Sequence, residues 1–364
     1  WSWMGLSVKS TMSWCLTRKE KNVKQKFVSV YDNGRLVGEP VVFIEKGGRA
    51  SAALAHVPEK ILRLYNPVSG EELGEEDFYR EENTLVLKGG KGKRLKSEWL
   101  RAKNLPHGIK HLGGEYGIDN ILLMDAARLA SFQYRADYIA PRPAFPETAY
   151  FSKALAPLRE KAGRGGKIKI LLYGDSISNA ANSSGEAGVP PFERPWYERA
   201  VEGMRAFFEN GNITLVNNSR SGYGSEWGAE NAFEKVEDAD LLIVAFGMND
   251  GSENLPCGKF AENIEKILSE RKNPGCSAIL VSSVLPHPDS ELYRLSLRKE
   301  YGAALKGICE EKSCAFMDML AVSEYYLERK NYCEVSGNNF NHPNDFMYRF
   351  YADTLEYLLT GKEN

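Results

Sequence analysis

The sequence lacks long apolar runs and any strong excess of charge. No stretch approaches the roughly 18 consecutive apolar residues of a membrane-spanning helix. The 47 Lys and Arg residues nearly balance the 49 Asp and Glu residues, which leaves a formal net charge of −2. A chain with so little net charge has no strong field to draw it to nucleic acid or to an anionic membrane. We therefore expect neither nucleic acid nor a membrane as a partner.

The cysteines and histidines that zinc sites need are few and scattered. The six cysteines include no C-x-x-C pair, and no pair of histidines lies next to a cysteine in the sequence. Zinc sites and disulfide frameworks both need regular spacings of such residues. We expect no metal and no cofactor.

We expect no signal peptide in the given sequence. Its first residues, WSWMGLSVKSTMSWCLTRKEK, show no basic segment followed by an apolar core. Secretory leaders have both. A cytoplasmic location is favoured, although a leader removed before Trp1 would make the protein secreted.

The first half of the sequence has the pattern of a β domain. At about 150 residues per domain, 364 residues predict two domains. Apolar runs rich in Val, Ile, Leu, Phe and Tyr follow one another with turn residues between them, at 26–34, 38–47, 60–70 and 83–90. The turn at Asp32 to Gly34 is a hairpin signal. Close strands without intervening helices predict a β-sandwich or jelly roll over residues 1–150, and the proline-marked stretch 137–150 is the expected connection out of it.

The second half alternates strands with helices. Apolar strands are expected at 167–173, 213–218, 240–246, 278–285 and 313–318. Amphipathic helices are expected at 196–210, 257–271 and 289–311, with a last helix that has Pro343 in its first turn. This alternation predicts a parallel sheet covered by helices on both faces, in an α/β domain over residues 151–364.

Polar residues follow the strands of this second half. Gly174, Asp175 and Ser176 follow its first strand, Gly222 follows the second, and Asn249 with Asp250 follows the third. His342 precedes the last helix. In open α/β sheets, ligands bind beyond the carboxyl ends of the strands.

Together these residues can perform acyl transfer. A histidine can activate a serine hydroxyl as a nucleophile, and N–H groups can stabilise the oxyanion that forms. Taken singly, Ser176 is a fair helix cap and Gly222 is a turn residue. Asn249 is then a loop residue that caps a helix, and His342 is a structural histidine beside a helix. Their occurrence together, in this order, favours an active site.

These four blocks resemble those of the SGNH (GDSL-type) esterases and lipases, over roughly residues 165–360. The resemblance implies a three-layer, flavodoxin-like α/β/α fold. It also implies Ser176 as nucleophile, His342 as general base, and the Ser176 N–H, Gly222 and Asn249 as the oxyanion hole. The elbow G-x-S-x-G does not occur in the chain, which disfavours the common α/β-hydrolase fold.

One residue departs from the family pattern. The family usually has Asp three residues before its histidine, and this chain has Asn339 there. In a serine protease, replacing the corresponding Asp by Asn costs about 10⁴ in kcat. Asn339 is a candidate to orient His342 in a weakened enzyme. The alternatives are a carboxylate from elsewhere, Glu334 or Asp345, and a Ser–His dyad oriented by a backbone carbonyl, which we favour.

The residues around the blocks favour an acetylated oligo- or polysaccharide as substrate. The polar loop 179–196 is long, as functional loops often are, and no apolar stripe beside the blocks is suited to a long acyl chain. The architecture resembles that of two-domain carbohydrate acetylesterases with an N-terminal β-sandwich. The alternatives are a thioesterase or lysophospholipase of the same superfamily, and a glycan-binding protein with a decayed hydrolase site. The residues expected to contact substrate are Trp196, Tyr223, Trp227 and Asp250.

Overall fold

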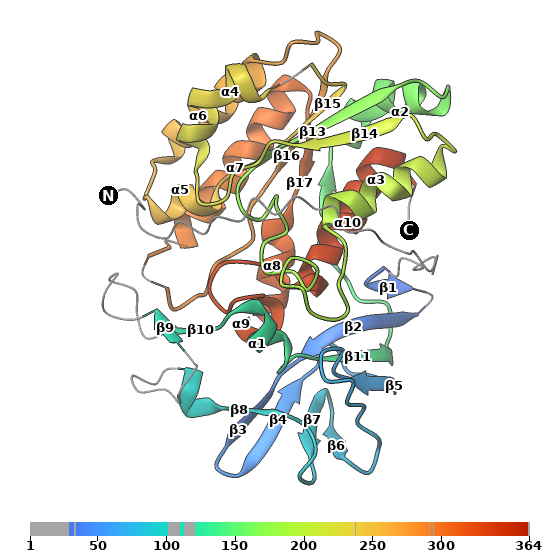
Figure 1. The fold of residues 1–364 in the computed structure, drawn as a ribbon, viewed down its shortest axis with the longest axis vertical. Helices are drawn as coiled ribbons and strands as arrows, with labels where there is room; N and C mark the ends of the chain where they lie inside the picture. Colours follow the sequence, from blue (N-terminus) through green and yellow to red (C-terminus); the bar gives the residue numbers. More distant parts are fainter. Residues whose placement is uncertain are drawn as a thin grey trace.

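The computed structural model describes residues 29–32, 34–100, 110–112, 121–236, 238–290, 292–293 and 295–362. An α/β part occupies the upper half of Figure 1 and a β-rich part the lower half. The first residues, on which the expectation about a leader depends, lie outside the described residues. None of the helices in the described ranges is both long and apolar enough to cross a bilayer.

The α/β part is built on a six-stranded sheet. Its order is β12-β17-β16-β15-β13-β14. The five strands from β13 onward are parallel, and they follow the order 2-1-3-4-5 of flavodoxin-like sheets. All five were predicted. The short edge strand β12, which pairs antiparallel with β17, was not. The bounds are β12 Ala149–Tyr150, β13 Ile168–Gly174, β14 Ile213–Asn217, β15 Leu241–Ala245, β16 Ser277–Val281 and β17 Ala315–Met317.

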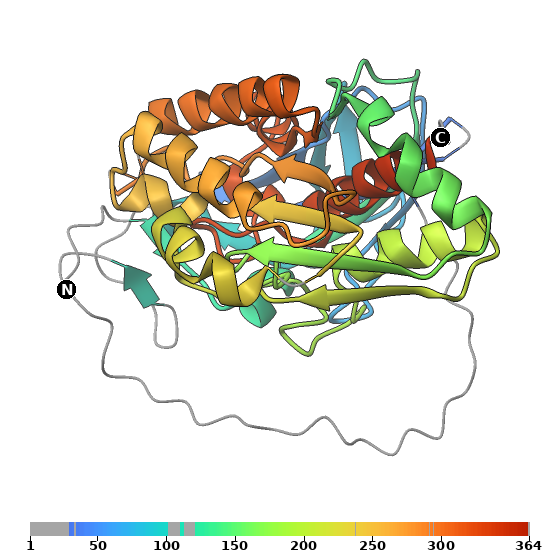
Figure 2. The ribbon, with the colours of Figure 1, turned by 90° about the horizontal axis from the view of Figure 1, so that it is seen from above.

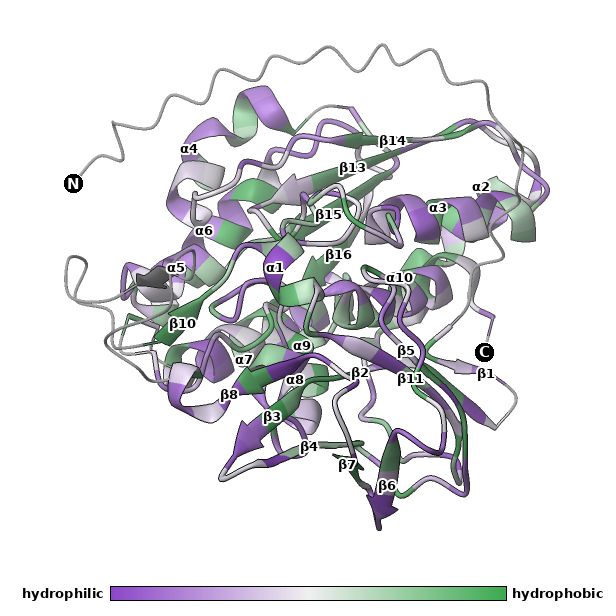
Figure 3. Ribbon diagram, turned by 60° about the horizontal axis from the view of Figure 1, so that its bottom comes forward, coloured by the Kyte–Doolittle hydropathy of each residue, from purple (hydrophilic) through white to green (hydrophobic). Residues whose placement is uncertain are grey.

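Helices cover both faces of this sheet, as the sequence predicts. Successive side chains of a strand point to opposite faces, so the strands contribute to two apolar layers. One layer packs on α4 (Ser225–Lys235), α6 (Cys257–Ser269) and α7 (Leu295–Lys312). The other packs on α2 (Ala156–Gly163), α3 (Trp196–Phe207) and α10 (Asp345–Thr360). Figure 2 shows the two sets of helices around the strands, and Figure 3 shows how hydrophobic the strands β13 and β16 are.

The last helix begins later than the sequence predicts. Asn344 is its N-cap, and the side chain of Asn344 accepts a hydrogen bond from the Met347 N–H. Pro343 therefore precedes the cap and is not in the first turn. The shorter helices are α1 Ala126–Ala130, α5 Met248–Ser252, α8 Met319–Leu327 and α9 Tyr332–Val335, with 3-10 turns at Ser97–Leu100 and Ser152–Leu155.

The β-rich part contains two main sheets, with orders β1-β2-β11-β5 and β6-β7-β4-β3-β8. Phe43 of one sheet and Tyr134 of the other pack edge to face with ring centroids 5.6 Å apart, so the sheets share one core. All neighbouring strands in them are antiparallel except β3 and β8. The bounds are β1 Tyr31–Asp32, β2 Arg35–Val41, β3 Phe43–Lys46, β4 Arg49–Ala53, β5 Lys60–Tyr65, β6 Phe78–Glu81, β7 Thr84–Leu87, β8 Arg94–Lys96 and β11 Tyr134–Ile139; a separate hairpin pairs β9 Lys110–Leu112 with β10 Ile121–Leu123.

Two details of this part differ from the sequence-based expectation, whereas the hairpin between β1 and β2 is confirmed. The run 38–47 is divided between β2 and β3, which belong to different sheets. The expected connection at 137–150 begins inside β11. That strand alternates buried and half-buried residues, as expected for a strand between two neighbours over a core. The division of the chain at residue 150 remains a prediction.

The two parts share one apolar core. The same cluster of buried side chains includes residues of β2 and β11 from the β-rich part and of α8 and α10 from the α/β part. Between the parts, Phe145 and Phe350 pack edge to face with centroids 5.6 Å apart. Figure 1 shows α8 and α9 at this junction.

Candidate active site

Ser176 lies in a tight turn at the carboxyl end of β13. Gly174 ends the strand, and a Cβ there would collide with the Ser178 Oγ and the Ala245 carbonyl, so only glycine fits. The N–H groups of Asn179 and Ala181 both donate to the Ser176 carbonyl at 3.1 Å. The turn does not continue into a helix, so Ser176 is not the helix cap that was weighed as its alternative role.

His342 meets Ser176 from the far end of the chain. The Ser176 Oγ and His342 Nε2 are 2.8 Å apart, the separation expected of a nucleophile and its base. The carbonyl of His342 accepts hydrogen bonds from the Ser336 hydroxyl at 2.8 Å and the Gly337 N–H at 2.9 Å. These bonds close the loop 336–343, which carries the imidazole.

Asn182 holds the other side of the imidazole. The Asn182 Oδ1 contacts His342 Nδ1. A carbonyl oxygen only accepts hydrogen bonds, so we assign the ring proton to Nδ1, which leaves Nε2 free to accept from Ser176. Burial lowers the pKa of His342 to about 4, so the ring is neutral at pH 7. The three side chains form a line, Ser–His–Asn.

This geometry corrects the expectations about what orients His342. The Asn339 Nδ2 donates to the Leu122 carbonyl of β10 at 2.7 Å and does not contact the ring. Glu334 pairs with Lys330 at 3.2 Å, and Asp345 pairs with Arg135 at 2.6 Å. The contacts to Nδ1 come from the side chains of Asn182 and of Asn338, whose Nδ2 lies 3.3 Å away, and not from a backbone carbonyl among the described residues.

Sequence reasoning missed Asn182. It lies in the loop 179–196, whose length and polarity were the only signal that the loop has a function. Nothing in its spacing links it to a histidine 160 positions away.

Gly222 and Asn249 lie at the same edge of the sheet as Ser176. They follow β14 and β15, the two neighbours of β13. The Arg220 N–H donates to the Gly174 carbonyl at 2.9 Å, which ties the Gly222 loop to the Ser176 turn. Gly222 has φ +83°, a left-handed conformation that favours glycine. The Asn249 Nδ2 donates to the Tyr223 carbonyl at 3.0 Å. The role of these residues as an oxyanion hole remains a prediction.

Two of the residues expected to bind substrate are buried. Trp196 is 1% exposed, and its indole N–H donates to the Ile177 carbonyl at 3.0 Å. Asp250 is 0% exposed, and its Oδ1 accepts from the Ser225 N–H at 2.8 Å. Burial raises the pKa of Asp250. Both side chains therefore stabilise segments near Ser176 from the protein interior and are not accessible to a substrate.

Tyr223 and Trp227 have accessible surface beside the Gly222 loop. Tyr223 is 37% exposed and Trp227 is half-buried. Their ring centroids are 5.3 Å apart, and the Arg220 guanidinium lies 4.1 Å from the Tyr223 centroid. We call Arg220, Tyr223 and Trp227 the aromatic shelf. Its contact with substrate remains a prediction.

Asp175 adds a buried carboxyl group next to the nucleophile. Its Oδ1 accepts from the Ile177 N–H at 2.9 Å. Burial raises the pKa of Asp175 to about 7. Within the described ranges, no group of three or more His, Cys, Asp and Glu side chains is arranged to hold a metal ion.

Residues 172–350, which include all of these blocks, match the GDSL-like Lipase/Acylhydrolase family. The matched residues all lie within the α/β part of the chain. The chain is also 27% identical over 122 residues to an arylesterase of Vibrio mimicus. That alignment covers 32% of this chain and 56% of the arylesterase, so it spans about half the length of that relative.

Solved structures similar to this chain include two hydrolases. Axe2, an acetylxylan esterase from Geobacillus stearothermophilus, has 18% identity and a TM-score of 0.45, with 54% of this chain and 95% of Axe2 covered. LAE5, an alpha/beta hydrolase enzyme from the metagenome of Lake Arreo, has 17% identity and a TM-score of 0.43, with 53% of this chain and 95% of LAE5 covered.

The match to the GDSL-like family model confirms the resemblance drawn from the sequence. Within the matched region, the described residues bring together the serine and the histidine that the sequence predicts, and they add Asn182.

Proposed function

We propose that this ester hydrolase removes short acyl groups, acetyl above all, from a carbohydrate through an acyl-Ser176 intermediate. The observation that carries the proposal is the 2.8 Å contact between the Ser176 Oγ and the His342 Nε2. With its lowered pKa, the imidazole is unprotonated at neutral pH and ready to act as a base.

The first half of the reaction forms the acyl-enzyme. The Ser176 Oγ attacks the acyl carbonyl carbon while its proton moves to His342 Nε2. The oxyanion accepts hydrogen bonds from the Ser176 and Gly222 N–H groups and the Asn249 amide. The bond between the acyl carbon and the sugar oxygen then breaks, and the leaving alkoxide takes the proton from His342.

The second half returns the enzyme to its starting state. A water molecule attacks the acyl-serine and gives a proton to His342 Nε2. The bond to the Ser176 Oγ breaks, the carboxylic acid leaves, and His342 returns the proton to Ser176. Through both halves the Asn182 Oδ1 accepts from Nδ1 and keeps the ring in one orientation.

Two small cavities lie near the Ser176 turn. The cavity lined by Asp175, Ile177 and Ser178 has a volume of about 10 Å³, and the cavity lined by Asn182 and Ser184 has a volume of about 30 Å³. One water molecule needs about 10 to 15 Å³, so each cavity holds one or two waters. Neither is lined by Ser176 or His342, so the length of the acyl group is decided by comparing acetyl with octanoyl esters.

The aromatic shelf supports a carbohydrate. Its two rings offer flat apolar faces with a polar edge. The shelf continues directly from Gly222, and the Tyr223 carbonyl accepts from Asn249. A sugar ring stacked there would lie beside the site of acyl transfer.

Hydrolysis of p-nitrophenyl acetate by the wild-type protein and by Ser176→Ala tests the proposal. We expect the substitution to reduce kcat at least a thousandfold, because no other side chain replaces the nucleophile. Ser178→Ala is the matched control, since that hydroxyl lies in the same turn and has no hydrogen-bond partner among the described residues.

Undiminished hydrolysis by Ser176→Ala would contradict the mechanism. The acyl specificity is tested by comparing acetyl with octanoyl esters, and the sugar by release of acetate from acetylated oligosaccharides. A clear preference for octanoyl esters would replace the acetylesterase by a thioesterase or lysophospholipase.

A further inference from the structure

Gln133, the residue before β11, and Arg135 within β11 direct their side chains toward the α/β part. Alternate residues of a strand point to opposite faces. Tyr134 and Ala136 are both fully buried in the core. Gln133 and Arg135, which flank Tyr134, bind loops of the α/β part.

Gln133 binds the segment that leads to His342. Its Nε2 donates to the carbonyls of Cys333 and Ser336, both at 2.8 Å. Cys333 lies in α9, and Ser336 begins the loop 336–343. Asn339 in the same loop donates to the Leu122 carbonyl at 2.7 Å. The loop that carries the imidazole is therefore held by residues of the β-rich part.

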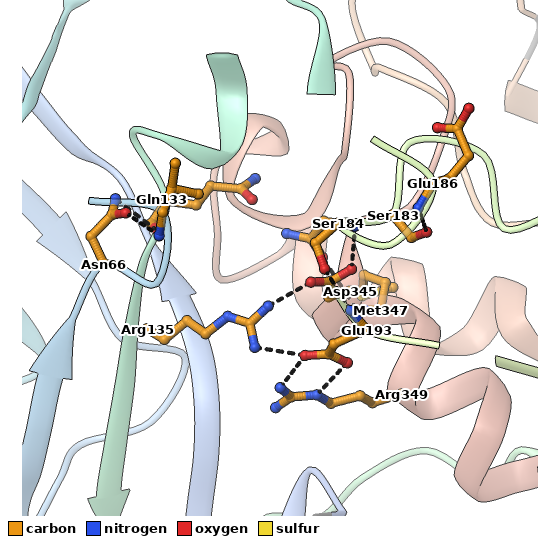
Figure 4. A network of polar contacts seen from close by, with 12 residues as sticks. Asn66, Gln133, Arg135, Ser183, Ser184, Glu186, Glu193, Asp345, Met347 and Arg349 are labelled. Carbon is orange, nitrogen blue, oxygen red and sulfur yellow. Dashed lines mark hydrogen bonds and ion pairs between the residues drawn. The ribbon is translucent and has the colours of Figure 1, made fainter. Parts of the chain in front are cut away.

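Arg135 binds the loop that carries Asn182. One guanidinium nitrogen donates to Glu193 and another to Asp345, each at 2.6 Å. The second carboxylate oxygen of Asp345 accepts from the Ser184 N–H at 2.7 Å. Figure 4 shows Arg135 reaching from β11 to both carboxylates.

These contacts are shielded from water. The Arg135 side chain is 11% exposed and that of Asp345 is 8% exposed. Hydrogen bonds between charged groups are stronger than neutral ones, and low exposure limits screening by solvent. Arg349 adds a second guanidinium to Glu193, and the neighbouring arginines hold the pKa of Glu193 well below its usual value.

We propose that Gln133 and Arg135 are positioning residues through which the β-rich part aligns His342 with Asn182. Gln133 fixes the position of the loop that carries His342. Arg135 fixes the position of the loop that carries Asn182, through Asp345 and Ser184. Both loops lack regular secondary structure of their own at these residues, so their relative position depends on side-chain contacts. The effect on catalysis rests on the proposed function, because a misplacement of about 1 Å costs on the order of a hundredfold in rate.

Arg135→Met and Gln133→Met in the full chain test the proposal with two readouts. We expect kcat for p-nitrophenyl acetate to fall about tenfold to a hundredfold, with KM nearly unchanged. In protein labelled with ¹⁵N-histidine, we expect the Nδ1–H resonance of His342 to shift or broaden. Arg135→Lys keeps the charge and one donor group, so it should recover part of kcat.

Arg63→Met is the matched control. Arg63 lies on β5 next to β11, and its ion pair with Glu72 is about half exposed. We expect this substitution to leave kcat and the His342 resonance unchanged. If Arg135→Met does not fold, as judged by circular dichroism, the uncharged Gln133→Met decides the question.

Wild-type kcat and an unchanged His342 resonance in the folded variants would overturn the proposal. A lower kcat with an unchanged resonance would also overturn it, because the loss would not act through the imidazole. The resonance is measured without substrate, so failure of the proposed hydrolysis is recognised separately, by Ser176→Ala that remains active.

Discussion

Residue 182 is a neutral amide, so it adds no charge beside the His342 imidazole. The Asn182 amide accepts from the ring as a carboxylate would, but it brings no negative charge to favour the imidazolium. Burial therefore acts on the ring without that opposing charge, and it lowers the pKa of His342 to about 4. We expect the base to remain neutral across the weakly acidic range.

Asn182→Asp should move the acidic limb of the pH profile to higher pH. A carboxylate beside Nδ1 stabilises the imidazolium and raises the pKa of His342, by about 1 to 3 units for close opposite charges. In the wild type, the neutral base is lost only as the pH falls through about 4, so kcat/KM should hold down to about pH 5. The measurement is kcat/KM from pH 4 to pH 9.

Asn182→Ala serves as the control for this prediction. It removes the acceptor without adding a charge, so we expect a lower kcat with no upward shift of the acidic limb. A wild-type limb at the ordinary histidine value of about 6.5, or a limb that Asn182→Asp leaves in place, would contradict the prediction.

Asn339→Asp should destabilise the protein without activating it. The substitution restores the residue usual for the family, but it removes the donor to the Leu122 carbonyl and places a carboxylate where the side chain is 1% exposed. We expect the free energy of unfolding to fall by about 1 to 3 kcal/mol, measured by urea unfolding, with no gain in kcat.

Asn254→Asp is the control, because it makes the same chemical change at an exposed position. Asn254, like Asn339, has a positive φ, and Asp tolerates that conformation. We expect little change in stability there. A gain in kcat for Asn339→Asp would mean that its side chain reaches His342 after all.

At the scale of elements, the sequence predicts the strands better than their connections. The parallel strands are continuous apolar runs because both faces of their sheet are covered. Strand β11 was missed because the prolines after Ile139 suggested a connection, although 134–139 alternates as a strand should. No local pattern encodes which strands become neighbours.

The same distinction applies to the candidate site. Ser176, Gly222 and Asn249 were predictable because they follow strands that end at one edge of the sheet. Asn182 and Gln133 were not, because their contacts depend on how irregular loops fold over 160 and 200 positions of sequence. Trp196 and Asp250 were wrongly expected to contact substrate, because the sequence does not show which residues near a loop are buried and which are exposed.

Gly222→Ala should affect both stability and catalysis. At φ +83° a Cβ meets no atom within 4 Å, so the cost is backbone strain of about 1 kcal/mol in the free energy of unfolding. Relief of that strain would rotate the N–H that is the proposed oxyanion donor, so kcat should fall about tenfold or more. Urea unfolding and p-nitrophenyl acetate hydrolysis measure the two effects.

Gly47→Ala isolates the strain from the chemistry. Gly47 has φ +60° with open space around it, in the turn between β3 and β4, far along the chain from the site. We expect a similar loss of stability with kcat unchanged. Equal kcat in both variants would remove Gly222 from the oxyanion hole.

At the scale of the whole molecule, a buried ion cluster joins the two parts. The Lys330 Nζ lies 3.2 Å from both Glu39 of β2 and Glu334 of α9, and all three side chains are 0% exposed. Tyr138 also donates to Glu39 at 2.6 Å. With the shared apolar core, this cluster should make both parts unfold together.

Lys330→Met should lower the stability of the entire chain. It leaves two buried carboxylates without their cation, which costs about 3 to 5 kcal/mol. We expect a single calorimetric transition in the wild type and a single, lower one in the variant. Lys299→Met, which removes an exposed ion pair with Glu324, should change little. Two separate transitions, with only one displaced by Lys330→Met, would contradict this expectation.

The contacts between the β-rich and α/β parts affect whether the α/β part can be fused to a different N-terminal domain. A gene fusion that keeps residues 151–364 and replaces the preceding strands would retain Ser176, Gly222 and Asn249. It would lose the donor of Gln133 and the guanidinium of Arg135, and with them the anchors of both loops that meet at the imidazole. We therefore do not expect residues 151–364 alone to keep the alignment of Ser176 with His342, and we expect the two parts to be inherited and to diverge as a single unit.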